Sequence, residues 1–452
     1  MAKSKLSAVL LALIISLSLI GCGNTTKTAN PDSVITNTNQ IEESTDKNDE
    51  NPSYGDKGYD EKKVLSVFTS PETVAVLKND SSLWILTKEY IEKNERSGSY
   101  REVFVKKLED VKYVDIYKNA VAAITKNGEI WLYGSNNYGI TEPSSTDNQG
   151  DDEQSFVKIM DDAILVELSE TNIGIVKSDG SLWIGGSNVY GQIGNGNSEP
   201  TASEPIQRVL DDVKDIKFGD GNAVALKNDG SVWTWGSNLS ASLGNGTNGD
   251  NGIHSNPTKI LEGAKAIHVA GLWGFQKTLV IKTDNSLWAW GGALDGVDEY
   301  PDNYFSNGTD FWDRATQTTP LKIMENVAQI GSTVYHNVPT ITIITTGNEL
   351  YLWGHLISGE EKQTFIEPTK VMDDVQNVDV HGGYIAAVQT NGSLWFRGEI
   401  NRGAYKSQEQ FTEIGKDVES VYAYKETKLY ALKVDGNLYW WIGGDTFGSE
   451  LF

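Results

Sequence analysis

The residues best suited to binding chemistry gather in one stretch of this sequence, residues 293–319. Aromatic side chains and carboxylates are interspersed there. The aromatic residues are Tyr300, Tyr304, Phe305, Phe311 and Trp312, and the acidic ones are Asp295, Asp298, Glu299, Asp302, Asp310 and Asp313. Aromatic rings beside carboxylates can stack on a sugar ring or a peptide, and the acids could hold Ca²⁺. The alternative is a loop that packs on its own aromatic rings. We take the five aromatic residues as the candidate binding site.

Other residue types that catalyse reactions form no recognisable motif. No two histidines stand at i, i+2 or i+4, and none belongs to an HExxH pattern; they are His254, His268, His336, His355 and His381. The sequence has neither a Gly-x-Ser-x-Gly elbow nor a Walker loop. Residues 244–252 resemble a calcium loop but lack its closing Glu, so we expect a turn-rich loop. We therefore predict no catalytic residue, no bound metal and no cofactor.

The single cysteine, Cys22, ends a segment typical of exported proteins. Lys3 and Lys5 precede an apolar run at 6–20, which is short for a membrane span and suits a signal peptide. The last four residues, Leu-Ile-Gly-Cys, resemble the bacterial lipobox. That resemblance implies cleavage before Cys22 and a diacylglyceryl group on its sulfur. An ordinary signal peptide, or a buried helix with a chance cysteine, is the alternative.

A polar segment separates this signal from the rest of the chain. Residues 23–63 are rich in Asn, Thr, Ser, Asp, Glu and Lys, and they hold too little apolar surface to offset the entropy of an ordered chain. We expect a signal peptide at 1–21, a lipidated flexible tether at 22–63 and a folded domain at 64–452. The protein would then sit on the outer side of a bacterial cell membrane, held by its lipid.

The composition favours a folded, acidic domain with many turns. Hydrophobic residues make up 38% of the chain, which is enough for a packed core, and 45 glycines indicate frequent tight turns. The net charge of −24 repels the phosphates of nucleic acids, so we expect no nucleic-acid partner. This charge would keep an exported protein soluble, or it could attract a basic partner or a cation. One cysteine permits no intramolecular disulfide.

The remainder of the chain repeats one unit, and the repeat decides the fold. The core of the unit is a turn followed by an aromatic strand, as in NDGSVWTWGSN at 228–238. Eight copies occur, at 79–88, 126–136, 178–188, 228–238, 283–292, 346–355, 390–399 and 434–443. Their key aromatic residues are Trp84, Trp131, Trp183, Trp233, Trp288, Tyr351, Trp395 and Tyr439. Two apolar strands precede each copy, and a short fourth strand follows most of them.

Three to four strands in every unit of about 50 residues are typical of a propeller blade. A helical solenoid would show a period of 3.6, and a β-helix a shorter repeat. We predict an all-β protein with a single β-propeller of seven to eight blades. The Asp-Gly or Asn-Gly pair should form a two-residue hairpin turn. Trp183 and Trp233 should fill equivalent spaces between neighbouring blades.

These units resemble the repeat of the regulator of chromosome condensation. The resemblance rests on ALKNDGSVWTWGSN…LGNGT at 225–247, preceded by DVKDIKFGDGNAVAL at 212–226. It implies a propeller, usually of seven blades, whereas eight hairpins are present here. It also implies binding rather than one fixed activity, because similar proteins exchange nucleotide on a GTPase, sense ultraviolet light or inhibit β-lactamases. The Gly-Trp-Arg-His-Thr motif of the light sensors is missing, so we expect the tryptophans to serve the core.

Two functions fit these features. The first is a membrane-anchored, extracytoplasmic scaffold, expected to be a monomer, that presents a propeller face to a protein or polysaccharide. The alternative is an extracytoplasmic hydrolase or lyase that uses carboxylates to act on glycans. Acidic residues are abundant, but sequence spacing does not show which of them meet in space. The lack of a catalytic motif favours the binding scaffold.

Overall fold

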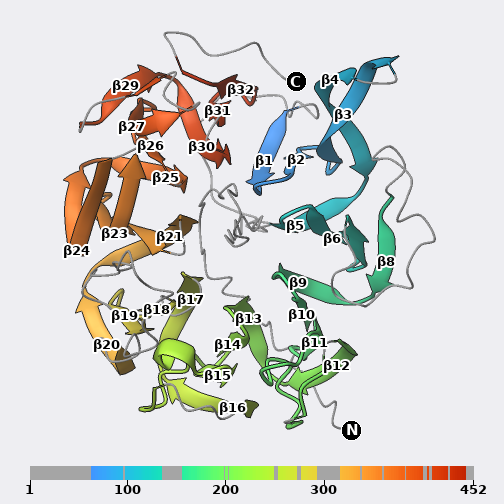
Figure 1. The fold of residues 1–452 in the computed structure, drawn as a ribbon, viewed down its shortest axis with the longest axis vertical. Coiled ribbons are helices and arrows are strands. Elements are labelled where there is room, and N and C mark those ends of the chain that lie inside the picture. The colour runs from blue at the N-terminus through green and yellow to red at the C-terminus, as the bar shows by residue number, and fades with distance from the viewer. Residues whose placement is uncertain are drawn as a thin grey trace, which may run out of the picture.

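The chain folds as an eight-bladed β-propeller, in which eight antiparallel sheets surround a central axis (Figure 1). This computed structural model describes residues 63–443 except 95–96, 135–154, 198, 202, 249–252, 272–275, 293–315, 336–337, 359–360, 382, 401–404, 407–409 and 426–427. The prediction of an all-β propeller is confirmed, with the larger of the two expected blade numbers. Cys22 and the expected tether lie outside the described residues.

Each blade adds its strands in chain order from the axis outwards. The strands are β1 (Val64–Thr69), β2 (Val74–Lys78), β3 (Leu83–Asn94) and β4 (Ser97–Leu108) in blade one; β5 (Val111–Tyr117), β6 (Ala120–Thr125), β7 (Ile130–Tyr133) and β8 (Val157–Met160) in blade two; β9 (Ala163–Leu168), β10 (Asn172–Lys177), β11 (Leu182–Gly186) and β12 (Glu204–Leu210) in blade three; β13 (Val213–Phe218), β14 (Asn222–Lys227), β15 (Val232–Gly236) and β16 (His254–Leu261) in blade four.

The second half of the ring repeats this order. Its strands are β17 (Ala264–Ala270), β18 (Lys277–Lys282), β19 (Leu287–Gly291) and β20 (Gln317–Met324) in blade five; β21 (Val327–Tyr335), β22 (Val338–Thr345), β23 (Leu350–Ser358) and β24 (Glu361–Met372) in blade six; β25 (Val375–His381), β26 (Tyr384–Gln389), β27 (Leu394–Ile400), β28 (Tyr405–Lys406) and β29 (Thr412–Gly415) in blade seven; β30 (Val418–Tyr424), β31 (Lys428–Lys433) and β32 (Leu438–Trp441) in blade eight. One short 3₁₀ turn, η1 (Leu239–Ala241), follows β15. Blade eight has three strands within the described residues.

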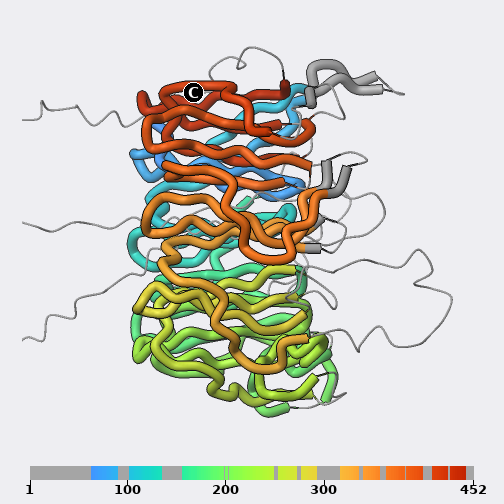
Figure 2. Tube along the Cα trace, turned by 90° about the vertical axis from the view of Figure 1, so that its left-hand side faces the viewer, coloured from blue at the N-terminus to red at the C-terminus, as the bar shows by residue number. Residues whose placement is uncertain are grey.

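The second strand of each blade forms much of the core. Every residue of β6, AVAAIT, is buried, and so is nearly every residue of β10, β14 and β26. Such a strand packs against neighbouring blades with both of its faces, so it shows a continuous apolar run rather than alternation. The strands cross the thickness of the ring from one face to the other (Figure 2).

A ring of eight backbone hydrogen bonds joins neighbouring blades. At each junction, the first N–H of the innermost strand donates to a carbonyl in the turn between the second and third strands of the preceding blade. The donor and acceptor pairs, 2.7 to 3.1 Å apart, are Val111 with Ser81, Ala163 with Gly128, Val213 with Gly180, Ala264 with Gly230, Val327 with Asn285, Val375 with Asn348, Val418 with Gly392 and Val64 with Gly436. The last pair joins blade eight to blade one, so the ring closes with the bond that every other junction uses.

The turns that accept these bonds are four residues long and not the expected two-residue hairpins. In blade four, Gly230 N donates to Lys227 O at 3.0 Å, and Lys227 N donates to Ser231 O at 2.9 Å. Gly230 has a φ of 81°, whereas Asn228 and Asp229 are not among the residues with positive φ. This is a type I turn closed by a glycine bulge. The carbonyl of the bulge residue is the one that accepts the bond from the next blade.

The tryptophans that fill the spaces between blades lie two residues beyond the expected ones. Trp183 and Trp233 are half-buried near the turn. Trp235 is fully buried, and its Nε1 donates to Gln192 O of blade three at 2.9 Å. Gly194 lies flat against this indole, because a Cβ there would come within 2.5 Å of Nε1. Equally buried tryptophans occupy the matching position of other blades; they are Trp290, Trp353 and Trp441.

This difference gives a first prediction. Trp235→Ala should lower the free energy of unfolding by about 3–5 kcal/mol, because it leaves a cavity between two blades. Trp233→Ala should cost clearly less, because that side chain already meets solvent. Chemical denaturation of both variants measures the two costs. An equal or larger cost for Trp233→Ala would contradict the assignment of the buried position.

Candidate functional site

The two faces of the propeller differ in how much their connections vary. On the face that we call the turn face, all eight links between second and third strands have four residues; they are 79–82, 126–129, 178–181, 228–231, 283–286, 346–349, 390–393 and 434–437. The links between successive blades also reach this face, and all seven have two residues: 109–110, 161–162, 211–212, 262–263, 325–326, 373–374 and 416–417. The eight blades therefore present links of the same length on the turn face, although their sequences differ.

The opposite face, which we call the loop face, carries the links between third and fourth strands. These range from the two residues 95–96 to the stretch 292–316. In blade one the link joins the two strands of a long hairpin, because β3 and β4 stay paired as far as Asn94 with Ser97. In blade six, pairing of β23 with β24 likewise continues to Ser358 and Glu361. Variation concentrated on one face of a constant frame is typical of a binding surface.

Two glycine-rich loops give part of the loop face a fixed shape. In the link 187–203, Asn188 Oδ1 accepts a hydrogen bond from Ile193 N at 3.1 Å, and Gly196 N donates to Ser255 O of the next blade at 2.9 Å. The link 237–253 repeats both contacts: Asn238 Oδ1 accepts from Leu243 N at 3.2 Å, and Gly246 N donates to Thr318 O at 2.8 Å. Each loop thus ties its own blade to the outer strand of the next one. Of the described residues, no group of three or more His, Cys, Asp and Glu is arranged to hold a metal.

An exposed aromatic residue projects from the first of these loops. Tyr190 is 42% exposed and its neighbour Val189 38%, so both are among the most exposed large apolar residues described. The Tyr190 ring lies against Gly221 of blade four, where a Cβ would come within 2.5 Å of the ring. Tyr190 N donates to Gln192 Oε1 at 2.8 Å. The backbone of this tyrosine is therefore held in place while much of its ring faces solvent.

The binding residues expected from the sequence, Tyr300, Tyr304, Phe305, Phe311 and Trp312, lie outside the described residues. The structure does describe where their segment begins and ends. It leaves β19 after Gly291 and enters β20 at Gln317, and both points belong to the loop face. Gly292 N donates to Gln276 O at 2.7 Å, and Thr316 Oγ1 accepts from Asn248 Nδ2 at 2.7 Å.

A second group of polar residues lies on the innermost strands around the axis. Their side chains reach from one blade to the next. Asp115 Oδ2 accepts from Leu168 N at 2.6 Å, and Lys217 Nζ lies 2.7 Å from Glu167 Oε2. Asp379 Oδ2 accepts from Ala423 N, and Asn377 Oδ1 from Val421 N, both at 2.8 Å. Sequence analysis missed this group, because its residues alternate with apolar ones as on any strand with one solvated side.

The charges in this group are unbalanced. Three carboxylates, those of Asp115, Glu167 and Asp215, surround the Lys217 ammonium, and all four side chains are buried. Burial raises the pKa of Asp115 to about 6, although Lys217 opposes the shift. Burial also raises the pKa values of Glu167 and Asp215, again against Lys217. The pKa of Lys217 is raised by Asp215 and Glu167, which outweigh its own burial.

Two histidines of the inner strands belong to the same group, His268, which is half-buried, and His381, which is buried. Burial lowers the pKa of His268 to about 3, with a further contribution from Lys217, and the ring Nε2 lies 2.8 Å from Ser332 Oγ of the next blade. Burial also lowers the pKa of His381 to about 3, and its ring stacks on Tyr384 at 5.7 Å. Both are therefore neutral at pH 7. Neither ring carries a charge that could bind an anion.

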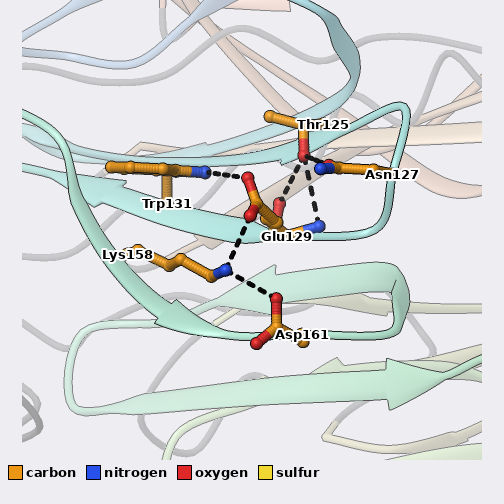
Figure 3. Close-up of polar contacts among 6 residues, drawn as sticks. All are labelled: Thr125, Asn127, Glu129, Trp131, Lys158 and Asp161. Carbon is orange, nitrogen blue, oxygen red and sulfur yellow. Dashed lines mark hydrogen bonds and ion pairs between the residues drawn. The ribbon is translucent and has the colours of Figure 1, made fainter.

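The aromatic residue of each repeat lies beside the turn face and is held by polar neighbours. Figure 3 shows the arrangement in blade two. Trp131 Nε1 donates to Glu129 Oε2 at 3.3 Å, and Glu129 Oε1 is 2.6 Å from Lys158 Nζ. Lys158 also pairs with Asp161 at 2.7 Å. Thr125 Oγ1 donates to Asn127 Oδ1 in the turn. The same cross-strand position holds a basic residue in most blades.

Models of the regulator of chromosome condensation (RCC1) repeat match residues 213–240 and 229–271, which span blade four and the start of blade five. Blade four and the start of blade five of this propeller therefore carry the RCC1 repeat. Human WBSCR16 has a similar fold, with 16% identity and a TM-score of 0.51 over 74% of this chain and 91% of that chain. Saccharomyces cerevisiae Prp20p shares 15% identity, with a TM-score of 0.46 over 71% of this chain and 83% of that chain. None of the curated protein sequences matches this chain.

The buried carboxylates predict how stability changes with pH. An acid whose pKa is higher in the folded than in the unfolded state binds more protons when folded, so its contribution to stability should fall as pH rises from about 4 to about 6. The lowered pKa values of His268 and His381 act in the opposite direction, so the contribution of Asp115 has to be measured as a difference between two proteins. Asp115 alone should contribute a loss of roughly 3 kcal/mol over this window. Asp115→Asn should remove this contribution alone, because the amide oxygen can still accept from Leu168 N, so the difference in the free energy of unfolding between wild type and variant should change across this window. Chemical denaturation between pH 4 and 7 tests this, and parallel pH curves for both proteins would refute it.

Proposed function

We propose that this protein is a binding scaffold that presents its loop face to a protein partner. One observation carries the proposal: the turn face is built from links of constant length, whereas the links on the loop face range from the two residues 95–96 and 359–360 to the stretch 292–316. Selection for a stable ring alone would not require that difference between the faces. Propellers of RCC1 repeats are generally binding or regulatory proteins rather than catalysts, which agrees with this role.

The chemistry of the loop face also suits a protein partner. Tyr190 and Val189 offer an exposed apolar contact on a backbone that is already ordered. Binding then costs little conformational entropy, which favours affinity. Aromatic side chains held in this way are common at the energetic centres of protein interfaces. The five aromatic residues between 300 and 312 would extend this contact, since their segment starts and ends on the loop face.

The proposal includes a lipid anchor on Cys22 and a position on the outer side of a bacterial membrane. Val64, the first residue of β1, bonds to Gly436 in a turn of the turn face. A tether that precedes Lys63 would therefore hold the propeller by its turn face and leave the loop face directed away from the membrane. Within the described part of the chain, no helix is long and apolar enough to span a bilayer.

A carboxylate-dependent hydrolase or lyase is less well supported. Such an enzyme needs two carboxyl groups that can reach a glycosidic bond. The carboxylates nearest the axis, Asp115, Glu167 and Asp215, are at most 6% exposed and are engaged by Lys217 or by backbone N–H groups. Their geometry suits contacts between blades better than contact with a substrate.

The loop-face proposal predicts a selective loss of binding. The partner would be captured by cross-linking on native cells and its affinity then measured with purified proteins. Tyr190→Ala should weaken binding by about tenfold, because it removes an ordered aromatic contact. Leu321→Ala is the matched control, since Leu321 is similarly exposed at 46% but lies on β20 at the outer wall. A loss that is equal for both variants would argue against the loop face.

The anchor gives a separate prediction. The wild-type protein should partition with membranes, and mass spectrometry should find a diacylglyceryl group on an N-terminal Cys22. Cys22→Ser should remove the lipid and abolish this modification without changing the thermal midpoint of the propeller, because the composition of residues 23–63 offers too little apolar surface to join a core. A mature N-terminus at another residue, without lipid, would refute the anchor while leaving the loop-face proposal open.

A further inference from the structure

The repeat supplies an internal standard against which each blade can be compared. In blade four, Trp233 Nε1 donates to Ser231 Oγ at 2.9 Å, and Lys227 Nζ lies 4.8 Å from the centroid of the indole ring. Directly opposite Trp233 on the next strand stands Lys259, which pairs with Glu262 at 2.5 Å. Blades one, three and five repeat the Ser contact, the Lys over the ring and the basic residue opposite it.

Blade seven keeps the serine of the repeat, Ser393, but departs from this standard in the lysine, in the opposite basic residue and in the acceptor of the indole N–H. Gln389 stands where Lys227 stands in blade four, and its Oε1 accepts from Trp395 Nε1 at 2.9 Å. Glu413 occupies the cross-strand position of Lys259 and pairs with Lys416 at 3.9 Å. The acid therefore precedes the base here, whereas the base precedes the acid in the pair of Lys259 with Glu262. Gln389 Nε2 also donates to Asp373 O at 3.0 Å, which fixes the amide that holds the indole. Among the residues that the structure describes, no lysine therefore lies over the Trp395 ring in the manner of Lys227.

A cavity of about 340 Å³ lies beside this tryptophan, at the border of blades six and seven. Its lining residues are Val371, Met372, Gln389, Trp395, Arg397, Gln410 and Phe411. Two changes in the repeat accompany the cavity. Arg397 takes the position of the buried Trp235, and the link 359–360 of blade six is too short to form the glycine-rich loop that covers Trp235. The junction of blades six and seven therefore lacks the indole and the covering loop that fill the junction of blades three and four.

The lining combines one cation with flat apolar surfaces. Arg397 carries the single charge among the residues that line the cavity. Its guanidinium is 5.9 Å from the Phe411 ring centroid and bonds to Gln363 Oε1, so the side chain is oriented from two sides. A guanidinium presents a fork of N–H donors that matches a carboxylate, and an indole face stacks on a ring. Glu413 accepts from Ser393 Oγ at 3.1 Å and is not part of the lining.

We propose that this cavity is a binding site for a uronic-acid residue of an acidic polysaccharide. Its carboxylate would pair with Arg397, its ring would stack on Trp395, and the exposed amide of Gln410 would bond to a hydroxyl. The volume is at the lower end of the range for small-ligand sites, which suits one or two sugar rings rather than a folded partner. An acidic peptide shares the charge but not the flat ring, so the tryptophan favours the sugar.

The site is separate from the loop face. Met372 and Gln389 are the last residues of β24 and β26, and the links that follow them, 373–374 and 390–393, belong to the turn face. The proposed sugar site therefore lies on the outer wall near the turn face, whereas Tyr190 lies on the loop face. The inference does not depend on the proposed protein partner, and either of the two could hold without the other.

Isothermal titration calorimetry of the full-length chain with trigalacturonate tests the proposal, with its methyl ester as the uncharged control ligand. Trigalacturonate should bind and the ester should bind at least tenfold more weakly, because it loses the charge pair with Arg397. Arg397→Gln should lower the affinity for the acid by at least tenfold and leave the ester unaffected. Trp395→Ala should weaken both ligands, because both stack on the indole.

Matched variants separate binding from folding. Trp183→Ala removes a half-buried tryptophan at the same repeat position of blade three and should not change sugar binding. Tyr190→Ala should not change it either. Thermal melts identify any variant that fails to fold, and Arg397→Lys then serves as the milder substitution. Equal affinity for acid and ester, tighter binding of a tetraglutamate peptide, equal losses in Trp183→Ala and Trp395→Ala, or no heat at millimolar trigalacturonate would each overturn the proposal.

Discussion

The eight hydrogen bonds between the first N–H of each inner strand and the preceding turn constrain everything else in this propeller. Each needs a carbonyl from a residue with positive φ, and all eight acceptors have one, from 60° at Asn348 to 87° at Gly128. The acceptor must also stand at one distance from the next strand, which explains why the turn links never change in length. Variation is therefore possible at the opposite face, where no such bond has to be kept.

At one end of the inner strands, backbone hydrogen bonds alone fix the distance between neighbouring blades. In the middle of these strands, buried polar side chains fix it. Asp115, Lys217 and Asp379 each reach across a junction to a partner on the adjacent blade. Burying charges is costly unless they are paired, and a lost partner leaves a penalty of several kcal/mol. Three carboxylates share one lysine here, so the buried group would carry excess negative charge if all three were ionised. Proton uptake by a carboxylate reduces this excess, in agreement with the raised pKa values of Asp115 and Glu167.

The repeat made the fold predictable, because a turn and an aromatic strand recur eight times with the same neighbours. Period-two alternation did not separate Trp233 from Trp235, which project from the same side of one strand. Their difference in burial depends on the loop at 187–203 of the preceding blade, which sequence spacing does not pair with them. Lys217 and Asp115 looked like solvated positions for a similar reason, since their partners belong to other blades. To predict the cavity beside Trp395 from the sequence, one would have to know which residues of two adjacent blades meet.

Closure through backbone atoms also explains how one blade can diverge without opening the ring. Blade seven has lost the lysine over its repeat aromatic residue, the basic residue opposite it and the buried tryptophan. It nevertheless keeps both junction bonds, Val375 N to Asn348 O at 2.7 Å and Val418 N to Gly392 O at 3.0 Å. Those bonds need only N–H groups, carbonyls and a turn residue that tolerates positive φ. Side chains between blades are therefore free to be exchanged for others that bind a ligand, provided that the turn is retained.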